Sequence, residues 1–291
     1  MPADDERKVI GIIGGSGLYS IEGLQDLKEE SVTTPFGEPS DAYITGTIDA
    51  TRVVFLPRHG KGHHILPSEI NFRANIYGMK MLGVNRIISV GAVGSMKEHI
   101  KPGSILIPDQ YIDLTKRRAS TFFGNGIVAH VSMAAPACPS LAKKLYDAGK
   151  RHKIKMYDGG TYLCIEGPQF SSKAESNVYR QWGVDVIGMT GMPEAKLARE
   201  AEICYATLAL VTDFDCWYEG VKDVEIGDVL KVMNENTANA KKLIRSVISG
   251  IEEKRTCACA HALKDSIITA RENIPRETKE SLSYIIKKYI Q

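Results

Sequence analysis

The stretch Leu208 to Trp217, LALVTDFDCW, is an apolar run that stops at Thr212 and is followed by two closely spaced carboxylates. The run from Ala206 to Val211 has the composition of a strand buried on both faces, as in a parallel sheet packed between helices. Open α/β sheets bind ligands beyond the carboxyl ends of their strands, so Asp213 and Asp215 are candidates for a binding or catalytic site. A turn followed by a helix cap is the alternative interpretation of these acids.

The composition is that of an ordinary globular chain of 291 residues, 43% hydrophobic and 25% charged, which argues against disorder. The formal net charge of +2 lacks the basic excess typical of nucleic-acid-binding proteins, so a small ligand is expected. No run approaches the roughly 20 apolar residues needed to cross a bilayer. The first residues carry no cationic leader followed by a hydrophobic region, so we expect a cytoplasmic protein that binds neither membrane nor nucleic acid.

Short apolar runs alternate with amphipathic stretches along the chain, and several of the runs end in polar or glycine-rich turns. Strands are predicted at 8–13, 43–48, 52–56, 86–90, 104–108, 157–165, 184–187 and 206–211. Helices are predicted at 67–82, 139–150, 173–182, 195–202 and 226–251, with a further helical stretch at 263–290 that is broken at Pro275. This alternation is typical of an α/β fold, and we expect the turns at the strand ends to converge on a pocket.

Three of the strand ends carry groups suited to an anion. The first strand runs into GGSG at 14–17, where backbone amides and the Ser16 hydroxyl can converge on a phosphate. A plain tight turn is the alternative there, because the run fits neither common nucleotide fingerprint. The strand at 52–56 ends in a cluster of cations, PRHGKGHH at 57–64, in which Arg58 offers a fixed fork of donors. The strand at 86–90 ends in a turn of small residues that lets the backbone approach a ligand.

The six cysteines fit no zinc-binding spacing. Four of them, Cys138, Cys164, Cys204 and Cys216, are scattered, and Cys257-Ala258-Cys259 is the only close pair. This pair can bind a metal, form a strained disulfide or remain as two thiols, and the spacing alone does not decide between these alternatives. No metal site is predicted from the sequence.

Six motifs in series resemble the purine nucleoside phosphorylase superfamily, and specifically its 5'-methylthioadenosine phosphorylase branch. They are GGSG at 14–17, RHGKGHH at 58–64, SVGAVGS at 89–95, IEGPQFSS at 165–172, GMTGMPE at 188–194 and TDFDCW at 212–217. The resemblance covers about residues 9–251. It implies a single α/β domain, 1–291, with a twisted, mixed and partly barrel-like β-sheet surrounded by α-helices. Residues 252–291 would follow this core as a C-terminal helical tail.

The reaction implied by the resemblance is the reversible phosphorolysis of 5'-methylthioadenosine to adenine and 5-methylthioribose 1-phosphate, in purine and methionine salvage. Inorganic phosphate is a co-substrate, and no cofactor is implied. The ligands of phosphate would be Ser16, Arg58, His59, Thr190 and the backbone amide of Ala92. The active form would be a homotrimer or homohexamer in which the neighbouring subunit contributes residues to the site.

The same motifs imply residues for the base and the ribose. Asp213 would be the general acid that protonates purine N7, with its pKa raised by burial beside Asp215. Asp215 would accept a hydrogen bond from the 6-amino group, which favours adenine over a 6-oxopurine. Met189 would pack on the ribose, while Phe170 and Ser171 would contact the base.

The 5' end of the nucleoside would lie in an apolar pocket whose wall is formed by residues at helical spacing, namely Ile226, Val229 and Leu230. His130 and Met133 match positions that reach into the site of the neighbouring subunit; a surface histidine is the alternative interpretation of His130. Gly91 departs from the family pattern, because the human-type branch carries a threonine there. One hydroxyl for phosphate is therefore missing.

Two alternative functions remain open. One is a broader purine nucleoside phosphorylase that acts on adenosine or on 6-oxopurine nucleosides, and the pair Asp213 and Asp215 argues against the 6-oxopurines. The other is a non-catalytic nucleoside-binding module. A binding module has no need for both an anion site and a proton donor, so the residues favour an enzyme.

Overall fold

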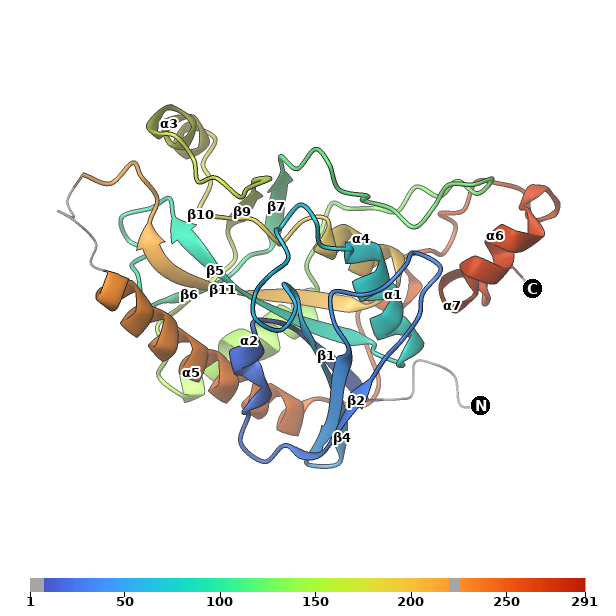
Figure 1. Cartoon of the computed structure of the whole chain (residues 1–291), viewed down its shortest axis with the longest axis horizontal. Helices are drawn as coiled ribbons and strands as arrows, with labels where there is room; N and C mark the ends of the chain where they lie inside the picture. Colours follow the sequence, from blue (N-terminus) through green and yellow to red (C-terminus); the bar gives the residue numbers. More distant parts are fainter. Residues whose placement is uncertain (1–7, 220–225, 291) are drawn as a thin grey trace.

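A mixed sheet of eleven strands runs through the molecule, with helices packed on both of its faces (Figure 1). The computed structural model describes residues 8–219 and 226–290. The strands are β1 (Val9–Gly14), β2 (Gln25–Glu30), β3 (Tyr43–Ile48), β4 (Thr51–Pro57), β5 (Arg86–Ser95), β6 (Ile105–Ile107), β7 (Gln110–Asp113), β8 (Met156–Asp158), β9 (Thr161–Cys164), β10 (Val186–Gly188) and β11 (Cys204–Phe214). This confirms the α/β fold class expected from the sequence.

The helices are α1 (Phe72–Met81), α2 (Pro139–Arg151), α3 (Lys173–Gln181), α4 (Glu194–Glu200), α5 (Ile226–Gly250), α6 (Arg276–Ser281) and α7 (Ser283–Ile286). Short 3₁₀ turns occur at Ser16–Tyr19, Ala258–His261 and Arg271–Asn273. Within the described ranges, no helix combines the length and the apolar character that a membrane span requires.

Four neighbouring parallel strands, in the order β4, β1, β5 and β11, form the centre of the sheet and end at one common edge. Gly14 at the end of β1 pairs with Pro57 at the end of β4, and Ala209 of β11 pairs with Gly91 of β5. Figure 1 shows β5 and β11 side by side through the middle of the molecule. The turns that follow these strands therefore converge where open α/β sheets bind ligands.

Both faces of the central strands are buried, which explains why their sequences are continuously apolar. Along β1, Ile10 and Ile12 belong to the hydrophobic layer formed with α2 and α5. Val9 and Ile13 belong to the opposite layer, formed with α1 and α4. Successive side chains of a strand point to opposite faces, so a strand between two helical layers has no polar face.

Strands β5 and β11 extend further than the sequence predicted. β5 was expected to end at Val90, but it continues to Ser95 because residues 91–95 remain paired with β11. β11 likewise passes Val211 and includes Asp213, with an irregularity in the register between these two residues. The small residues of β5 and the first carboxylate are therefore held within paired strands and do not lie in free loops.

Two other predicted boundaries are wrong for local reasons. The helix expected at 67–82 begins only at Phe72, because the side chain of Asn71 accepts a hydrogen bond from a backbone amide of the first turn and caps the helix there. The strand expected at 157–165 is split into β8 and β9. Gly159-Gly160 adopts positive φ values of 81° and 124°, which break the extended backbone.

The C-terminal tail is less helical than expected. Helices α6 and α7 follow Pro275, but the residues before it form only short 3₁₀ turns. Ile267 forms an isolated β-bridge with Ala129, and Leu263 and Ile274 are buried in the layer that contains α1 and α4. The apolar residues of this stretch are thus separate anchors on the core, and their spacing does not reflect a helix.

Candidate active site

A cavity of about 400 Å³ lies at the common carboxyl edge of the central strands, within the usual size range of small-molecule sites. It is bounded by the turns after β1 and β4, by the middle of β5, by the end of β11 and by one face of α5. The lining residues are Gly14, Gly15, Gly17, Leu18, Pro57, His59, Gly60, Gly62, His63, Val90, Gly91, Ala92, Leu210, Thr212, Met233, Asn234 and Thr237.

The glycine-rich turn after β1 forms one wall of this cavity. The backbone N–H of Arg58 donates to the carbonyl of Gly14 at 3.0 Å, so the turns after β1 and β4 are fixed side by side. A side chain on Gly15 would meet nothing within 4 Å, so the backbone here is open to a ligand. The side chain of Ser16 lies outside what the structure describes, and its role as a phosphate ligand stays a prediction.

Arg58 is buried, with only 2% of its surface exposed, and is held in a dense polar network. Its Nε and Nη2 form a paired contact with the carboxylate of Glu194 at 2.9 and 3.1 Å. Nη2 also donates to Ser89 Oγ at 2.7 Å and to the carbonyl of Ile13 at 3.3 Å. Nη1 donates to the carbonyl of Val90 at 3.0 Å. These contacts fix the orientation of the guanidinium, and no partner among the described residues takes the second N–H of Nη1, which can therefore donate to a ligand.

This Nη1 lies where other predicted phosphate ligands meet. A Cβ built on Gly91 would lie 3.9 Å from Arg58 Nη1 and 3.5 Å from Thr190 Oγ1. Ala92, the next residue of β5, lines the cavity. The structure thus brings together Arg58, Thr190 and Ala92, although they come from three different segments of the chain.

His59 lines the same cavity as a neutral imidazole. Its Nδ1 lies 2.8 Å from the carbonyl of Ile65, and because a carbonyl only accepts, Nδ1 carries the proton and Nε2 is an acceptor. Its ring stacks on that of His63, with centroids 4.2 Å apart. Burial lowers the pKa of His59 to about 4, and the charges of Arg58 and His63 act in the same direction. A neutral His59 can accept a hydrogen bond from a protonated phosphate oxygen.

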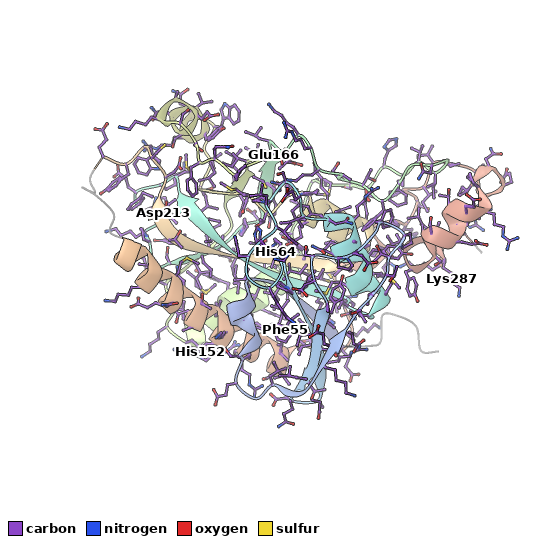
Figure 2. The ribbon with its side chains drawn as sticks, in the orientation of Figure 1. Phe55, His64, His152, Glu166, Asp213 and Lys287 are labelled. Atoms are coloured by element: carbon purple, nitrogen blue, oxygen red, sulfur yellow. The ribbon has the colours of Figure 1, made fainter. Side chains whose placement is uncertain are left out.

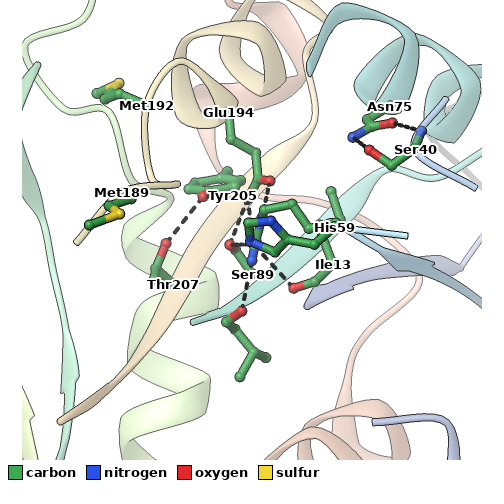
Figure 3. A network of polar contacts seen from close by, with 12 residues as sticks. Ile13, Ser40, His59, Asn75, Ser89, Met189, Met192, Glu194, Tyr205 and Thr207 are labelled. Atoms are coloured by element: carbon green, nitrogen blue, oxygen red, sulfur yellow. Dashed lines mark hydrogen bonds and ion pairs between the residues drawn. The ribbon is translucent and has the colours of Figure 1, made fainter. Parts of the chain in front are cut away.

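Glu194 is a site residue to which the sequence assigned no role, although it ends the GMTGMPE motif. Its carboxylate is 1% exposed and, besides Arg58, accepts from Ser89 Oγ at 2.6 Å and from Tyr205 Oη at 2.8 Å. Figure 3 shows Glu194 reaching toward Ser89 and Tyr205. A buried arginine needs a counter-charge, so an acid beside Arg58 could be expected. The sequence does not say which acid this is.

Arg118 is a second residue that sequence reasoning missed, and it fixes the loops expected to carry ribose and base contacts. Its Nε donates to Glu166 Oε1 at 2.9 Å, and its Nη2 donates to the carbonyl of the same residue. Its Nη1 donates to the carbonyls of Met189 and Met192. The side chain of Met189 packs closely against Gly167. Glu166, labelled in Figure 2, thus stands at the junction of these loops.

The two carboxylates lie at the end of β11, where Figure 2 labels Asp213. Asp213 Oδ1 accepts from Thr212 Oγ1 at 2.6 Å. Burial raises the pKa of Asp213 and the charge of Asp215 adds to this effect, whereas the Thr212 hydroxyl opposes it. The direction is the one expected for a proton donor. Asp215 is buried; its N–H donates to the carbonyl of Ser95, and its Oδ2 accepts from the Ser176 hydroxyl.

The IEGPQFSS loop ends near these acids. The carbonyl of Ser171 lies 3.2 Å from the thiol of Cys216, the residue after Asp215. Ser171 Oγ is buried and has no hydrogen-bond partner among the described residues. Phe170 is 86% exposed, so its ring is available to a ligand or to another subunit. The contacts of both residues with a base stay predictions.

Most of the side chains predicted to form the 5' pocket are not among those that the structure describes. Helix α5 begins at Ile226, but the side chains of Ile226, Val229 and Leu230 lie outside the described residues. Further along the same helix, Met233 and Thr237 line the cavity. The face of α5 that carries these two residues therefore borders the cavity.

His130 and Met133 do not line the cavity of their own chain as the structure describes it. His130 is exposed, and its backbone N–H donates to the carbonyl of Ser266. Met133 is partly buried against the layer that contains α1 and α4. A contribution of either residue to the site of a neighbouring subunit stays a prediction.

The structure corrects the interpretation of the cysteines as scattered. The sulfur atoms of Cys138, Cys204, Cys257 and Cys259 all lie within 4.8 Å of one another. All four are free thiols. They come from the residue before α2, the first residue of β11 and the segment after α5, so no local spacing could reveal their proximity.

The chain is similar to known proteins in sequence and in overall fold. The sequence profile of the Phosphorylase superfamily matches residues 9–249. The S-methyl-5'-thioadenosine phosphorylase of Geobacter sulfurreducens is 57% identical over 285 residues, which are 98% of this chain and 100% of that protein. A crystal structure of a methylthioadenosine phosphorylase from an antarctic soil metagenomic library has a TM-score of 0.92 at 48% identity, and the match covers 97% of this chain and 99% of that chain. The methylthioadenosine phosphorylase of Schistosoma mansoni in complex with adenine has a TM-score of 0.83 at 33% identity, covering 89% and 99%.

Proposed function

Because the chain belongs to the phosphorylase superfamily, we propose that it catalyses the reversible phosphorolysis of 5'-methylthioadenosine to adenine and 5-methylthioribose 1-phosphate. The observation that carries this proposal is that residues predicted to bind an anion and a residue predicted to donate a proton lie on the same pair of strands. Ala92, beside the anion site, pairs with Leu210, and Asp213 pairs with Gly94. The two sites are thus about 7 Å apart along the strands, a separation of the order of one sugar ring.

The chemistry of phosphorolysis needs both ends of this arrangement. Breaking the glycosidic bond leaves positive charge on the ribose and negative charge on the purine. A phosphate held by Arg58, Thr190 and the amide of Ala92 stabilises the first charge and attacks the sugar. Asp213, with its raised pKa, retains a proton closer to neutral pH than an ordinary aspartate and donates it to purine N7.

Asp215 supports adenine as the base. Because Ser176 donates to its Oδ2, the carboxylate is held in place, and Oδ1 is left to accept from an exocyclic amino group. A 6-oxo group would place one acceptor against another in a buried site, which is strongly unfavourable. The names of the relatives support methylthioadenosine as the nucleoside.

We further propose that the active form is a homotrimer or homohexamer in the cytoplasm, with His130 contacting the site of a neighbouring subunit. The segment beside His130 supports this assembly, because the apolar side chains of Val128 and Ile268 are 48% and 64% exposed. The N–H of Ile268 donates to the carbonyl of Val128 at 2.9 Å, so the two form one patch. Native mass spectrometry tests the assembly, and a monomer at assay concentration would contradict it.

The function is tested by measuring phosphate-dependent release of free base from methylthioadenosine, adenosine and inosine in parallel. We expect adenine from methylthioadenosine in clear preference. Asp213→Asn should reduce the rate by about 10²-fold or more, the usual effect of losing a general acid. Asp265→Asn is the matched control, because Asp265 is exposed in the C-terminal segment and should keep the wild-type rate.

The other outcomes of this assay are equally informative. Hypoxanthine released efficiently from inosine would overturn the role assigned to Asp215. Release of no base from any nucleoside, with binding of the nucleosides retained, would favour a nucleoside-binding module. Adenosine cleaved as fast as methylthioadenosine would contradict an apolar pocket for the 5' end.

A further inference from the structure

Four cysteine sulfurs gather at the amino end of β11, away from the candidate active site. All four lie within 4.8 Å of one another, and the sulfurs of Cys204 and Cys257 are 3.3 Å apart. In a tetrahedral zinc site with Zn–S bonds of about 2.3 Å, neighbouring sulfurs are about 3.8 Å apart. The observed spacings bracket this value, so a zinc ion needs only small shifts of the side chains.

The surroundings of the four sulfurs are cationic, which distinguishes them from a cluster of packed apolar thiols. Arg199 Nη1 donates to Cys259 Sγ at 3.6 Å. Arg86 is buried and lines the same small crevice as Cys138, Cys204 and Cys257. Zinc bound by four thiolates carries two excess negative charges, and two nearby arginines offset them.

A small crevice gives access to the cluster. Its volume is about 20 Å³, and its lining includes Cys138, Cys204 and Cys257 together with Arg86 and Lys144. A space of this size accommodates about one water molecule or ion. The sulfurs therefore border an opening through which a single small ion can reach them.

We propose that Cys138, Cys204, Cys257 and Cys259 bind one zinc ion, which ties the segment after α5 to the amino ends of β11 and α2. Four soft thiolate ligands in a tetrahedral arrangement select zinc among the common divalent ions that keep one oxidation state. The thiolate is the form that binds metal.

Each sulfur is within reach of the other three, which suits one shared ion and does not single out two disulfide pairs. The role of the ion is structural. Cys204 and Asp213 stand at opposite ends of β11, about 30 Å apart along the strand. Zinc should therefore raise thermal stability and leave the chemistry of the active site unchanged.

The test begins with the full chain, purified without chelator and under reducing conditions, and analysed for metal by plasma mass spectrometry. We expect about one zinc per chain, and the same after the metal-free protein is reconstituted with Zn²⁺ under anaerobic conditions. The variant Cys257→Ser/Cys259→Ser should bind essentially none. Cys216→Ser is the matched control, because Cys216 is exposed and lies outside the cluster; it should bind as much zinc as the wild type.

Stability and thiol chemistry separate the proposal from its alternatives. A chelator should lower the Tm of the wild type but not that of the double serine variant, while kcat and KM measured well below the Tm stay the same. In a second preparation, purified without reductant and then denatured in chelator, the chain should show all six thiols. A count of four or two thiols, with a chain mass lower by about two or four daltons, would show one or two disulfides. That result would overturn the zinc proposal. Failure to take up zinc at about one ion per chain would also overturn the proposal.

Discussion

The contact between Arg58 and Glu194 gives the sharpest prediction, because both partners are almost completely removed from water. Their side chains are 3% and 1% exposed. The substitution Glu194→Gln keeps the shape of the side chain and removes its charge. It leaves the guanidinium buried without a counter-charge, and it turns one of the acceptors for Arg58, Ser89 and Tyr205 into a donor.

The expected loss of stability follows from this geometry. Breaking a buried ion pair by removing one partner costs about 3–5 kcal/mol, because the remaining charge is uncompensated. Glu194 accepts two hydrogen bonds from Arg58, one from Ser89 and one from Tyr205, so the upper part of this range applies. Because Arg58 Nη1 also faces the predicted phosphate site, the KM for phosphate should rise in the same variant.

Urea denaturation at pH 7 measures the first effect, and initial rates at varied phosphate measure the second. Glu280→Gln is the matched control: it removes one partner of the Arg276–Glu280 pair, whose side chains are 91% and 62% exposed. Exposed pairs of this kind contribute little to stability, because water screens them. If Glu194→Gln cost no more than the control, the buried contact would not hold Arg58 in place, and the account of the anion site given above would be wrong.

Three further predictions concern base recognition, phosphate binding and pH. Asp215→Asn supplies a donor to a 6-oxo group, so release of adenine should fall by about 10²-fold while release of hypoxanthine from inosine rises; unchanged preference would contradict the role of Asp215. Gly91→Thr has room for its Cβ beside Thr190 and Arg58, and the added hydroxyl should lower the KM for phosphate roughly tenfold; an unchanged or higher KM would argue against a phosphate site there. Burial raises the pKa of Glu200 from 4.5 to about 7, so the folded state binds an extra proton between these values and wild-type stability should fall by about 3 kcal/mol as pH rises through this window. Glu200→Gln should remove that part of the pH dependence, and denaturation curves at pH 5 and pH 8 that differ equally in both proteins would refute the assignment.

The sequence predicts the approximate positions of candidate residues best where they follow strands. Arg58 and Asp213 stand at or near strand ends, and parallel neighbours end at the same edge of a sheet. Their approximate positions therefore follow from the order of the strands. Glu194 and Arg118 act through long-range contacts to Arg58 and Glu166, and nothing in their local sequence names those partners.

The extent of β5 could not be predicted, because its second half reads as a turn. Glycine weakens a strand in isolation, and the run after Val90 contains Gly91 and Gly94. Pairing with the whole length of β11 overrides this local tendency. These glycines leave the backbone of β5 uncovered at the site, since the position of a Cβ at Gly91 faces Thr190 and Arg58.

Strand β11 carries a residue of the proposed zinc site at one end and a residue of the candidate active site near the other. We expect changes at the two sites to have separate effects. Its residues from Cys204 to Thr212 are buried, so the strand is held along nearly its whole length by packing against its neighbours. An ion at Cys204 adds to the free energy of holding the amino end of the strand, whereas Asp213 at the other end depends on the register with β5. Since packing alone maintains that register, loss of the ion should lower the temperature at which the strand leaves the sheet. Below that temperature, Asp213 should keep its position. A variant that lost zinc together with the preference for adenine at low temperature would show instead that the cysteine cluster sets the register of β11.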